Sequence, residues 1–205
     1  MSSRPFCQSR TLVIVDMTTA VLTGLGLAGA AGLNAYIPLL VVGVLVHLGY
    51  LSVAAPFDSL GQTPILIVLA ALLAVEFFAD KIPGVDSIND IVQTVIRPAA
   101  GAFLAAGSLG TLTHLPPWVG VAAGIITAGS VHGVKAVSRP VINVGTAGIG
   151  GPTVSVVEDL VALAASFLAI IAPILLAILV VIGVMFGLRY LRNRQKKSSR
   201  TTAMG

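Results

Sequence analysis

A long stretch near the start of the chain, from Thr18 to Tyr50, contains no Asp, Glu, Lys or Arg. As one helix it would be about 50 Å long at 1.5 Å per residue, whereas the hydrocarbon core of a bilayer is about 30 Å thick. We therefore expect the stretch to tilt or to break around residues 32–38, because Pro38 removes a backbone donor and clashes with the preceding turn. Asn34, at the break, would then face protein or water.

The composition extends this argument to the whole chain. Of 205 residues, 56% are hydrophobic and only 10% are charged, whereas a soluble domain carries about 25% charged residues. Because a crossing takes about 20 apolar residues, we expect an all-α, polytopic integral membrane protein with about six transmembrane helices, one or more of them broken or re-entrant. Besides 18–50, the spans are expected near residues 64–78, 96–112, 118–137, 154–171 and 174–191. Pro173 would separate the last two, and one kinked helix is the alternative.

The positions of the basic residues predict the orientation. With six crossings, the connections 49–63, 113–117 and 172–173 lie on one side and contain no Lys or Arg, so all 12 basic residues fall on the other side. Short basic loops stay in the cytoplasm. We therefore expect a multi-pass protein of the cell inner (plasma) membrane with both termini cytoplasmic.

The ends of the chain are expected to lie outside the bilayer. Residues 1–17 would form a disordered cytoplasmic leader, 18–191 the six-helix transmembrane domain, and 192–205 a basic disordered cytoplasmic tail. The formal charge of +4 comes from terminal runs rather than from a folded face, so the expected surroundings are the lipid bilayer and not nucleic acid. The single cysteine, Cys7, excludes an internal disulfide.

A V-x-x-V-x-R-P pattern occurs twice, at Val92–Pro98 and at Val134–Pro140. The two copies suggest a parallel repeat, around residues 64–112 and 118–171, related by an axis along the membrane normal. The alternative is that Arg-Pro is simply a common way to begin a membrane span.

Ten ionisable residues lie at or inside the span boundaries, and at a helix centre each unpaired charge would cost about 2.5 to 3.5 kcal/mol. Six acids stand against four bases, so complete pairing would leave two carboxylates that could be protonated or meet a cation. Together with Asn34 and Tyr36 they are our candidates for an ion or substrate pathway: Glu76, Asp80, Lys81, Asp86, Asp90, Arg97, Lys135, Arg139, Glu158 and Asp159.

Two groups of these acids have open interpretations. The run Glu76–Asp90 is either a capped helix-turn-helix at the interface or a broken segment that lines a polar cavity. Glu158 and Asp159 lie a full turn past the expected helix start, and we expect at least one to meet Arg97, Lys135 or Arg139. Such a contact would be a structural ion pair or part of a transport or proton-relay path.

Other motifs predict no chemistry. The glycine-rich run Gly145–Gly151 matches no nucleotide-binding pattern and is expected to be a connector. The three histidines are isolated, so we expect no metal site, and no motif indicates a cofactor or catalytic residue. Gly120, Gly124 and Ala128 form a stripe of small residues, which favours close helix packing and would suit a homo-oligomer.

Four segments together resemble the DUF4126 family, small membrane proteins of unknown function: Ala31–Leu39, Glu76–Asp90, Arg97–Gly101 and Val154–Asp159. The resemblance covers about residues 18–191, and the A-D-K-I-P-G-V-D run is its most specific part. It implies a polytopic helical membrane protein and supplies no substrate, reaction or site residue. The chain departs from the family pattern in its glycine-rich segment around 143–152.

Three functions fit these observations. A small transporter or channel for an ion or small solute would use the intramembrane carboxylates. A scaffold or assembly protein would need the charges only for its fold. A lipid-phosphate enzyme is the third, but only three residues separate Lys135 from Arg139 where the K-x6-R-P element of lipid phosphatases has six.

Overall fold

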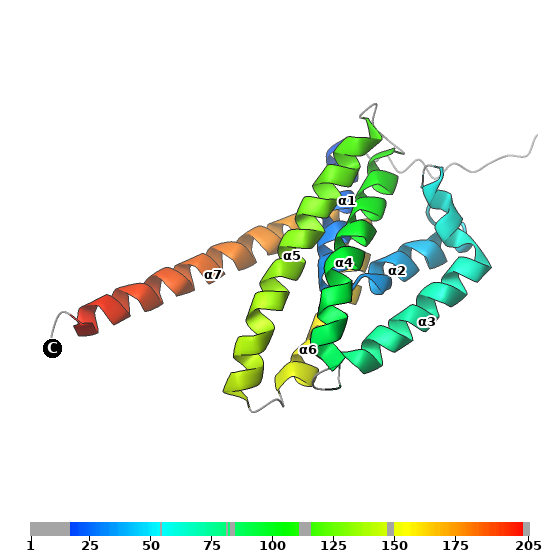
Figure 1. Cartoon of the computed structure of the whole chain (residues 1–205). Helices are drawn as coiled ribbons and strands as arrows, with labels where there is room; N and C mark the ends of the chain where they lie inside the picture. Colours follow the sequence, from blue (N-terminus) through cyan, green and yellow to red (C-terminus); the bar gives the residue numbers. More distant parts are fainter. Residues whose placement is uncertain are drawn as a thin grey trace, which may run out of the picture.

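The computed structural model describes residues 17–53, 55–80, 82, 85–110, 116–146 and 150–202, and all regular structure within them is helical (Figure 1). The helices are α1 (Met17–Leu33), α2 (Tyr36–His47), the 3-10 helix η1 (Phe57–Gly61), α3 (Thr63–Ala79), α4 (Val85–Gly110), α5 (Pro117–Gly145), α6 (Gly150–Ile171) and α7 (Pro173–Thr202). The expected leader over 1–17 lies outside the described residues except for Met17, which begins α1.

The first apolar stretch is broken, as predicted, and the break lies between Leu33 and Tyr36. The side-chain oxygen of Asn34 accepts hydrogen bonds from the backbone N–H groups of Tyr36, at 3.0 Å, and Ile37, at 3.2 Å. A helix leaves its first N–H groups without partners inside the helix. Asn34 therefore ends α1 and satisfies the start of α2, while Pro38 lies in the first turn of α2, where it breaks no helical hydrogen bond.

The start of α1 lies beside the end of α4 and the end of α6. Gly24 packs against Ala105 of α4, and the Thr23 hydroxyl donates to the Ala169 carbonyl of α6 at 2.9 Å. The far end of α1 lies beside the second half of α5, where Gly32 packs against Val131. Helix α1 thus runs antiparallel to α4 and α6 and parallel to α5 (Figure 1).

Helix α2 turns back toward the end from which α1 came. The η1 segment that follows it packs Phe57 against Phe103 of α4, with ring centroids 4.7 Å apart, and against Gly107. Helix α2 therefore does not continue in the direction of α1, as a single broken crossing over 18–50 would require. The start of α1 and the end of α2 lie together near the end of α4. The break between the two helices lies inside the bundle. The capping by Asn34 permits this reversal, which hydropathy alone does not encode.

Helices α4 and α5 pack closely because small residues meet between them. A Cβ atom at Gly120 would lie 2.7 Å from the Cα of Ala106, and Gly101 faces Gly124 and Ala128 across the interface. Gly120, Gly124 and Ala128 are thus buried inside one chain. The close helix packing expected of this stripe is confirmed, with α4 as its partner.

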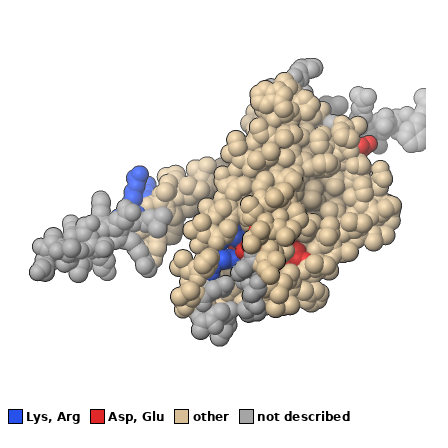
Figure 2. Space-filling model, in the orientation of Figure 1, with Lys and Arg blue, Asp and Glu red and all other residues tan. Residues whose placement is uncertain are grey.

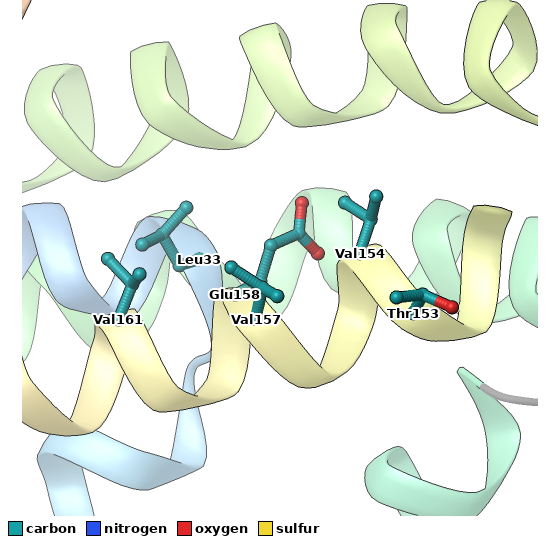
Figure 3. Close-up of a pocket in the computed structure, with 6 residues that line it drawn as sticks. All are labelled: Leu33, Thr153, Val154, Val157, Glu158 and Val161. Carbon is teal, nitrogen blue, oxygen red and sulfur yellow. The ribbon is translucent and has the colours of Figure 1, made fainter.

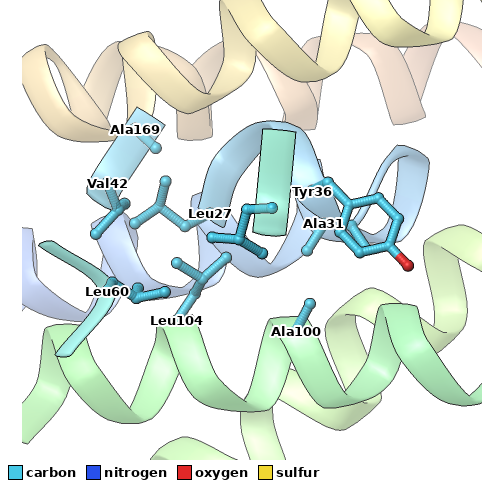
Figure 4. Close-up of a cluster of buried hydrophobic side chains, with 10 residues drawn as sticks. Leu27, Ala31, Tyr36, Val42, Leu60, Ala100, Leu104 and Ala169 are labelled. Atoms are coloured by element: carbon cyan, nitrogen blue, oxygen red, sulfur yellow. The ribbon is translucent and has the colours of Figure 1, made fainter. Parts of the chain in front are cut away.

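A cluster of buried apolar side chains holds the α1–α2 pair in place. It combines Leu27 of α1, Val42 of α2, Leu60 of η1 and Leu104 of α4 with Ala169 of α6 (Figure 4). Because these residues come from five elements far apart in sequence, the cluster fixes the position of the break relative to α4 and α6.

Large Val, Leu, Ile and Phe side chains are exposed on most helices, and few charged side chains are visible on the face shown in Figure 2. Within the described part, three segments are long and apolar enough to cross a membrane: Pro117–Ile142, Gly150–Ile171 and Pro173–Tyr190. Helices α1, α2 and α3 are apolar but shorter. By length and composition, three segments thus qualify as spans, and α1 and α2 do not because the first apolar stretch is divided into two short helices.

The boundaries of the later helices also differ from those expected. A separate α6 and α7 confirm the division near Pro173. Helix α7 continues to Thr202, so 192–202 is helical and not a disordered tail, because no Gly or Pro interrupts the charged segment. The V-x-x-V-x-R-P copies lie early in α4 and late in α5, with Pro98 and Pro140 inside these helices. Because α4 and α5 are antiparallel, the copies do not occupy equivalent places in parallel units.

Candidate functional site

A buried ionic cluster lies at the break between α1 and α2. Its first part is an ion pair between Glu76, in the last turn of α3, and Arg97 of α4, with 2.8 Å between Oε1 and Nη2. The side chains are 1% and 0% exposed, respectively. The second oxygen of Glu76, Oε2, has no hydrogen-bond partner among the described residues.

His132 of α5 extends this pair and is neutral in this geometry. Its Nδ1 lies 3.1 Å from Nη1 of Arg97, and its Nε2 lies 3.1 Å from the Thr94 hydroxyl. A guanidinium can only donate hydrogen bonds, so Nδ1 must accept and the ring proton must be on Nε2. The Thr94 hydroxyl donates in turn to the Asp90 carbonyl. His132 therefore adds no positive charge to the cluster.

The second part of the cluster gathers two bases and three acids. Nη2 of Arg139 lies 2.9 Å from Oδ2 of Asp80 and 3.3 Å from Oε2 of Glu158. Nζ of Lys135 lies 2.7 Å from the same Glu158 oxygen and 3.7 Å from Asp80 Oδ2. Asp90 meets Arg139 at 3.5 Å. Asp80 also accepts hydrogen bonds from side chains of the neighbouring helices, namely Asn89 of α4 and Ser155 of α6.

The break in the first helix pair is bonded directly to this cluster. Nζ of Lys135 donates to the Leu33 carbonyl at 3.0 Å, which satisfies an acceptor at the end of α1. The Asn34 amide donates to Oδ1 of Asp159 at 2.9 Å while its oxygen accepts from the start of α2. The positions of two helix ends and of the ionic residues therefore depend on one another.

The expectation that Glu158 or Asp159 meets one of the three bases is confirmed, and the acids of α3 pair with the same bases. The individual partners are now specified: Arg97 meets Glu76 rather than Glu158, and Glu158 meets Lys135 and Arg139. Lys81 lies outside the described residues, as does the side chain of Asp86. Tyr36 is buried, with its hydroxyl directed away from the apolar side chains around it (Figure 4).

Two uncharged side chains, His132 and Ser155, also belong to the cluster, although neither is among the candidate site residues. His132 was isolated in sequence, yet it shares a face of α5 with Lys135 and Arg139 because residues three and four apart lie side by side on a helix. The same spacing places Ser155 of α6 next to Glu158. This spacing within each helix is the signal in the sequence that places His132 and Ser155 beside the charged residues.

Among the side chains that the structure describes, the cluster holds five carboxylates and three bases. The acids are Glu76, Asp80, Asp90, Glu158 and Asp159, and the bases are Arg97, Lys135 and Arg139. With His132 neutral, full ionisation would leave an excess of two negative charges. Isolated buried carboxylates are unfavourable and become neutral by taking up a proton or meeting a cation.

One pocket lies on the surface beside the cluster. It has a volume of about 280 Å³ and is lined by Leu33 of α1 and by Thr153, Val154, Val157, Glu158 and Val161 of α6 (Figure 3). The Glu158 side chain is 13% exposed, whereas those of Lys135 and Asp80 are each 2% exposed. Within the described residues, no group of three or more His, Cys, Asp and Glu side chains is arranged to hold a metal ion.

An all-helical chain with an apolar exterior, long apolar helices and a buried ionic cluster has the construction of an integral membrane protein. The chain belongs to the family described as domain of unknown function DUF4126, whose model matches residues 21–193. No curated protein and no solved structure matches it.

Proposed function

We propose that this protein is a small membrane transporter that couples movement of a solute to binding of a proton or monovalent cation in the ionic cluster. The observation that carries the proposal is a buried cluster around a broken helix pair that, among the described side chains, holds five carboxylates and three bases. Ionisable residues inside membranes characteristically mark ion and substrate paths. Discontinuous helices commonly form such sites in secondary transporters, because their free ends supply hydrogen-bonding groups.

Glu158 is the residue that we assign to proton or cation exchange. Of the two carboxylates that pair with Lys135, Glu158 is the more exposed, and it is among the residues that line the pocket. When Glu158 takes up a proton, Lys135 loses its closest ionic partner. The ammonium group then relies on Asp80, now 3.7 Å away, and on the carbonyl of Leu33. Protonation would therefore shift Lys135 and, through Leu33, the end of α1.

The fold also supports a revised orientation. Helices α3 to α7 would each cross the membrane, while α1 and α2 enter together from one face. The end of α3 and the start of α4, the end of α5 and the start of α6, and the end of α7 would lie on the side that carries the clustered bases. Because basic segments remain in the cytoplasm, we place the C-terminus in the cytoplasm and the start of α1 on the opposite side of the membrane. The membrane in this proposal is the cell membrane.

A scaffold function is the second candidate, and one observation favours it. Each described base of the cluster has at least one acidic partner within 3.5 Å, as expected when charges only fix the packing of helices. A scaffold with this cluster would need no exchange at Glu158.

Transport distinguishes the two candidates. Purified protein in liposomes would be given a pH or Na⁺ gradient, and an enclosed pH-sensitive dye would report proton movement. We expect the wild type to dissipate the gradient and Glu158→Gln to be slower by a factor of about 10 or more. Asp58→Asn is the matched control, since Asp58 is exposed in η1 and far from the cluster in the fold. If folded wild-type protein moves neither protons nor Na⁺ above protein-free liposomes, the scaffold function replaces transport.

A further inference from the structure

We infer that the end of α7 is a binding surface for anionic phospholipids, whose phosphate groups meet a run of basic residues there. This run, from Arg189 to Arg200, is called the basic segment below. It contains six bases and no acid: Arg189, Arg192, Arg194, Lys196, Lys197 and Arg200. The inference is independent of the proposed transport function, because it needs neither the ionic cluster nor exchange at Glu158.

Helix α7 holds the basic segment close to the surface of the bilayer. It is one helix from Pro173 to Thr202, and its first part, Pro173–Tyr190, is long and apolar enough to cross a membrane. At 1.5 Å per residue this part is about 27 Å long, close to the hydrocarbon thickness of about 30 Å. Lys197 follows about 11 Å further along the axis, and the Debye length at 0.1 M salt is about 10 Å. Even an upright helix therefore keeps five of the six bases within electrostatic reach of the headgroups.

The bases also share one side of the helix. With 3.6 residues per turn, five of their positions fall within an arc of about 140°: Arg189, Arg192, Lys196, Lys197 and Arg200. A tilt of α7 toward that side would bring the five positions to the membrane together. Four of the six bases of the segment are arginines, whose planar guanidinium can form two parallel hydrogen bonds with a phosphate.

The rest of the protein leaves the basic segment available to lipid. The start of α7 packs against the bundle, where Leu176 meets Gly26, whereas every residue from Ile178 to Tyr190 is exposed. Beyond its start the helix leads away from the bundle (Figure 1). The last acid of the chain is Asp159, in α6, so the basic segment has no acidic neighbour on its own helix.

The other described bases near this side of the membrane are already neutralised inside the protein. Arg97, Lys135 and Arg139 are 0%, 3% and 5% exposed, and each pairs with a carboxylate of the cluster. The exposed bases among the described side chains are those of α7, at a distance from the cluster (Figure 2). Among these residues, α7 thus provides the positive charge that a headgroup can reach.

Anionic phospholipid fits this charge better than other partners do. The cytoplasmic leaflet has a negative surface potential, and clusters of four to eight Lys and Arg directly after a transmembrane helix are typical of binding to anionic headgroups. A zwitterionic lipid has the same phosphate but adds a positive group that the bases repel. The basic segment of a second copy would be repelled for the same reason. The net negative charge of the headgroup is therefore the selected feature.

The test is equilibrium binding of two fluorescent lipids to the purified full chain in a neutral detergent. Phosphatidylglycerol and phosphatidylcholine would have the same acyl chains and the same label, so that they differ in headgroup charge. We expect phosphatidylglycerol to bind at least about tenfold more tightly at about 0.1 M NaCl. The difference should shrink at about 0.5 M NaCl, because the Debye length falls to about 4 Å. Equal affinities of the two lipids for the wild type would overturn the inference.

Two triple variants locate the bound lipid. Replacing Lys196, Lys197 and Arg200 with glutamine together should reduce the preference for phosphatidylglycerol by at least about fivefold. The matched control replaces Ser198, Ser199 and Thr201 with glutamine, which changes the same segment without changing its charge, and it should bind like the wild type. Helicity and elution volume check that both variants fold. An unchanged preference in the first variant would place the anionic lipid elsewhere and refute the assignment.

Other partners of the basic segment would give different results. A short RNA that binds the wild type in vesicles rich in phosphatidylglycerol, but not the first triple variant, would make nucleic acid the partner and overturn the lipid assignment. A dimer in light scattering that dissociates in the same variant would make a second copy the partner. A monomer that binds no RNA in such vesicles, together with the lipid preference above, supports the inference.

Discussion

The ion pair between Glu76 and Arg97 offers the sharpest test of how this cluster contributes to stability. At 2.8 Å, the gross attraction is about 6 kcal/mol with an effective dielectric constant of about 20. Desolvation offsets much of this attraction, but removing one partner leaves the other buried and unpaired. Arg97→Met should therefore lower the free energy of unfolding by about 3 to 5 kcal/mol, and Glu76→Met by a similar amount.

The double variant isolates the interaction. Replacing both residues with methionine removes both charges together, and such replacements of buried pairs are often neutral. We expect the double variant to lose at least about 3 kcal/mol less than the sum of the single losses. Unfolding would be measured by titrating the micelle-bound protein with SDS and following helicity by circular dichroism. Arg189→Met, on the exposed surface of α7, is the control and should change stability little.

The outcome that would refute the reasoning is additivity. If the two single losses sum to the double loss within about 0.5 kcal/mol, Glu76 and Arg97 do not depend on each other for stability. A single loss below about 1 kcal/mol would likewise mean that water reaches the pair, because exposed ion pairs contribute only about that much.

Three further outcomes are expected. Gly124→Leu should destabilise the protein by at least about 2 kcal/mol, because the new side chain would overlap α4. Gly133→Leu is the control and should not destabilise it, because Gly133 faces open space. Thermal unfolding in detergent compares the two variants. Asn34→Ala should lose about 0.5 to 2 kcal/mol of stability, because the hydrogen bonds to the start of α2 are lost. Asn34→Asp should lose more, because its carboxylate would face the Asp159 carboxylate that Asn34 now contacts. Equal losses of stability in the two variants would show that Asp159 is protonated. In protein without its native cysteine, Thr18→Cys and Ser52→Cys should react with an impermeant thiol reagent from the same side of the membrane; labelling from opposite sides would restore the single-crossing path for this stretch.

Several features could be read from the sequence because they depend on local properties. The absence of charge from Thr18 to Tyr50 predicted a break, and the backbone breaks between Leu33 and Tyr36. Pro173 predicted the division between α6 and α7 for the same kind of reason, since a proline lacks an N–H group wherever it stands. The cost of unpaired charge in an apolar setting predicted that the acids and bases would meet.

Only the tertiary structure decided the direction of α2, the identity of each ionic partner and the use of the Gly120 stripe. Hydropathy gives the same value for a helix that crosses the bilayer and for one that turns back, so the return of α2 depends on Asn34 and on the apolar cluster around Leu60. Which base meets Glu158 depends on the axial shift and the rotation of α5 relative to α6. The periodicity within a single helix gives no information on either quantity. The neutral state of His132 likewise follows from a neighbour on another helix, Arg97, whose guanidinium can only donate.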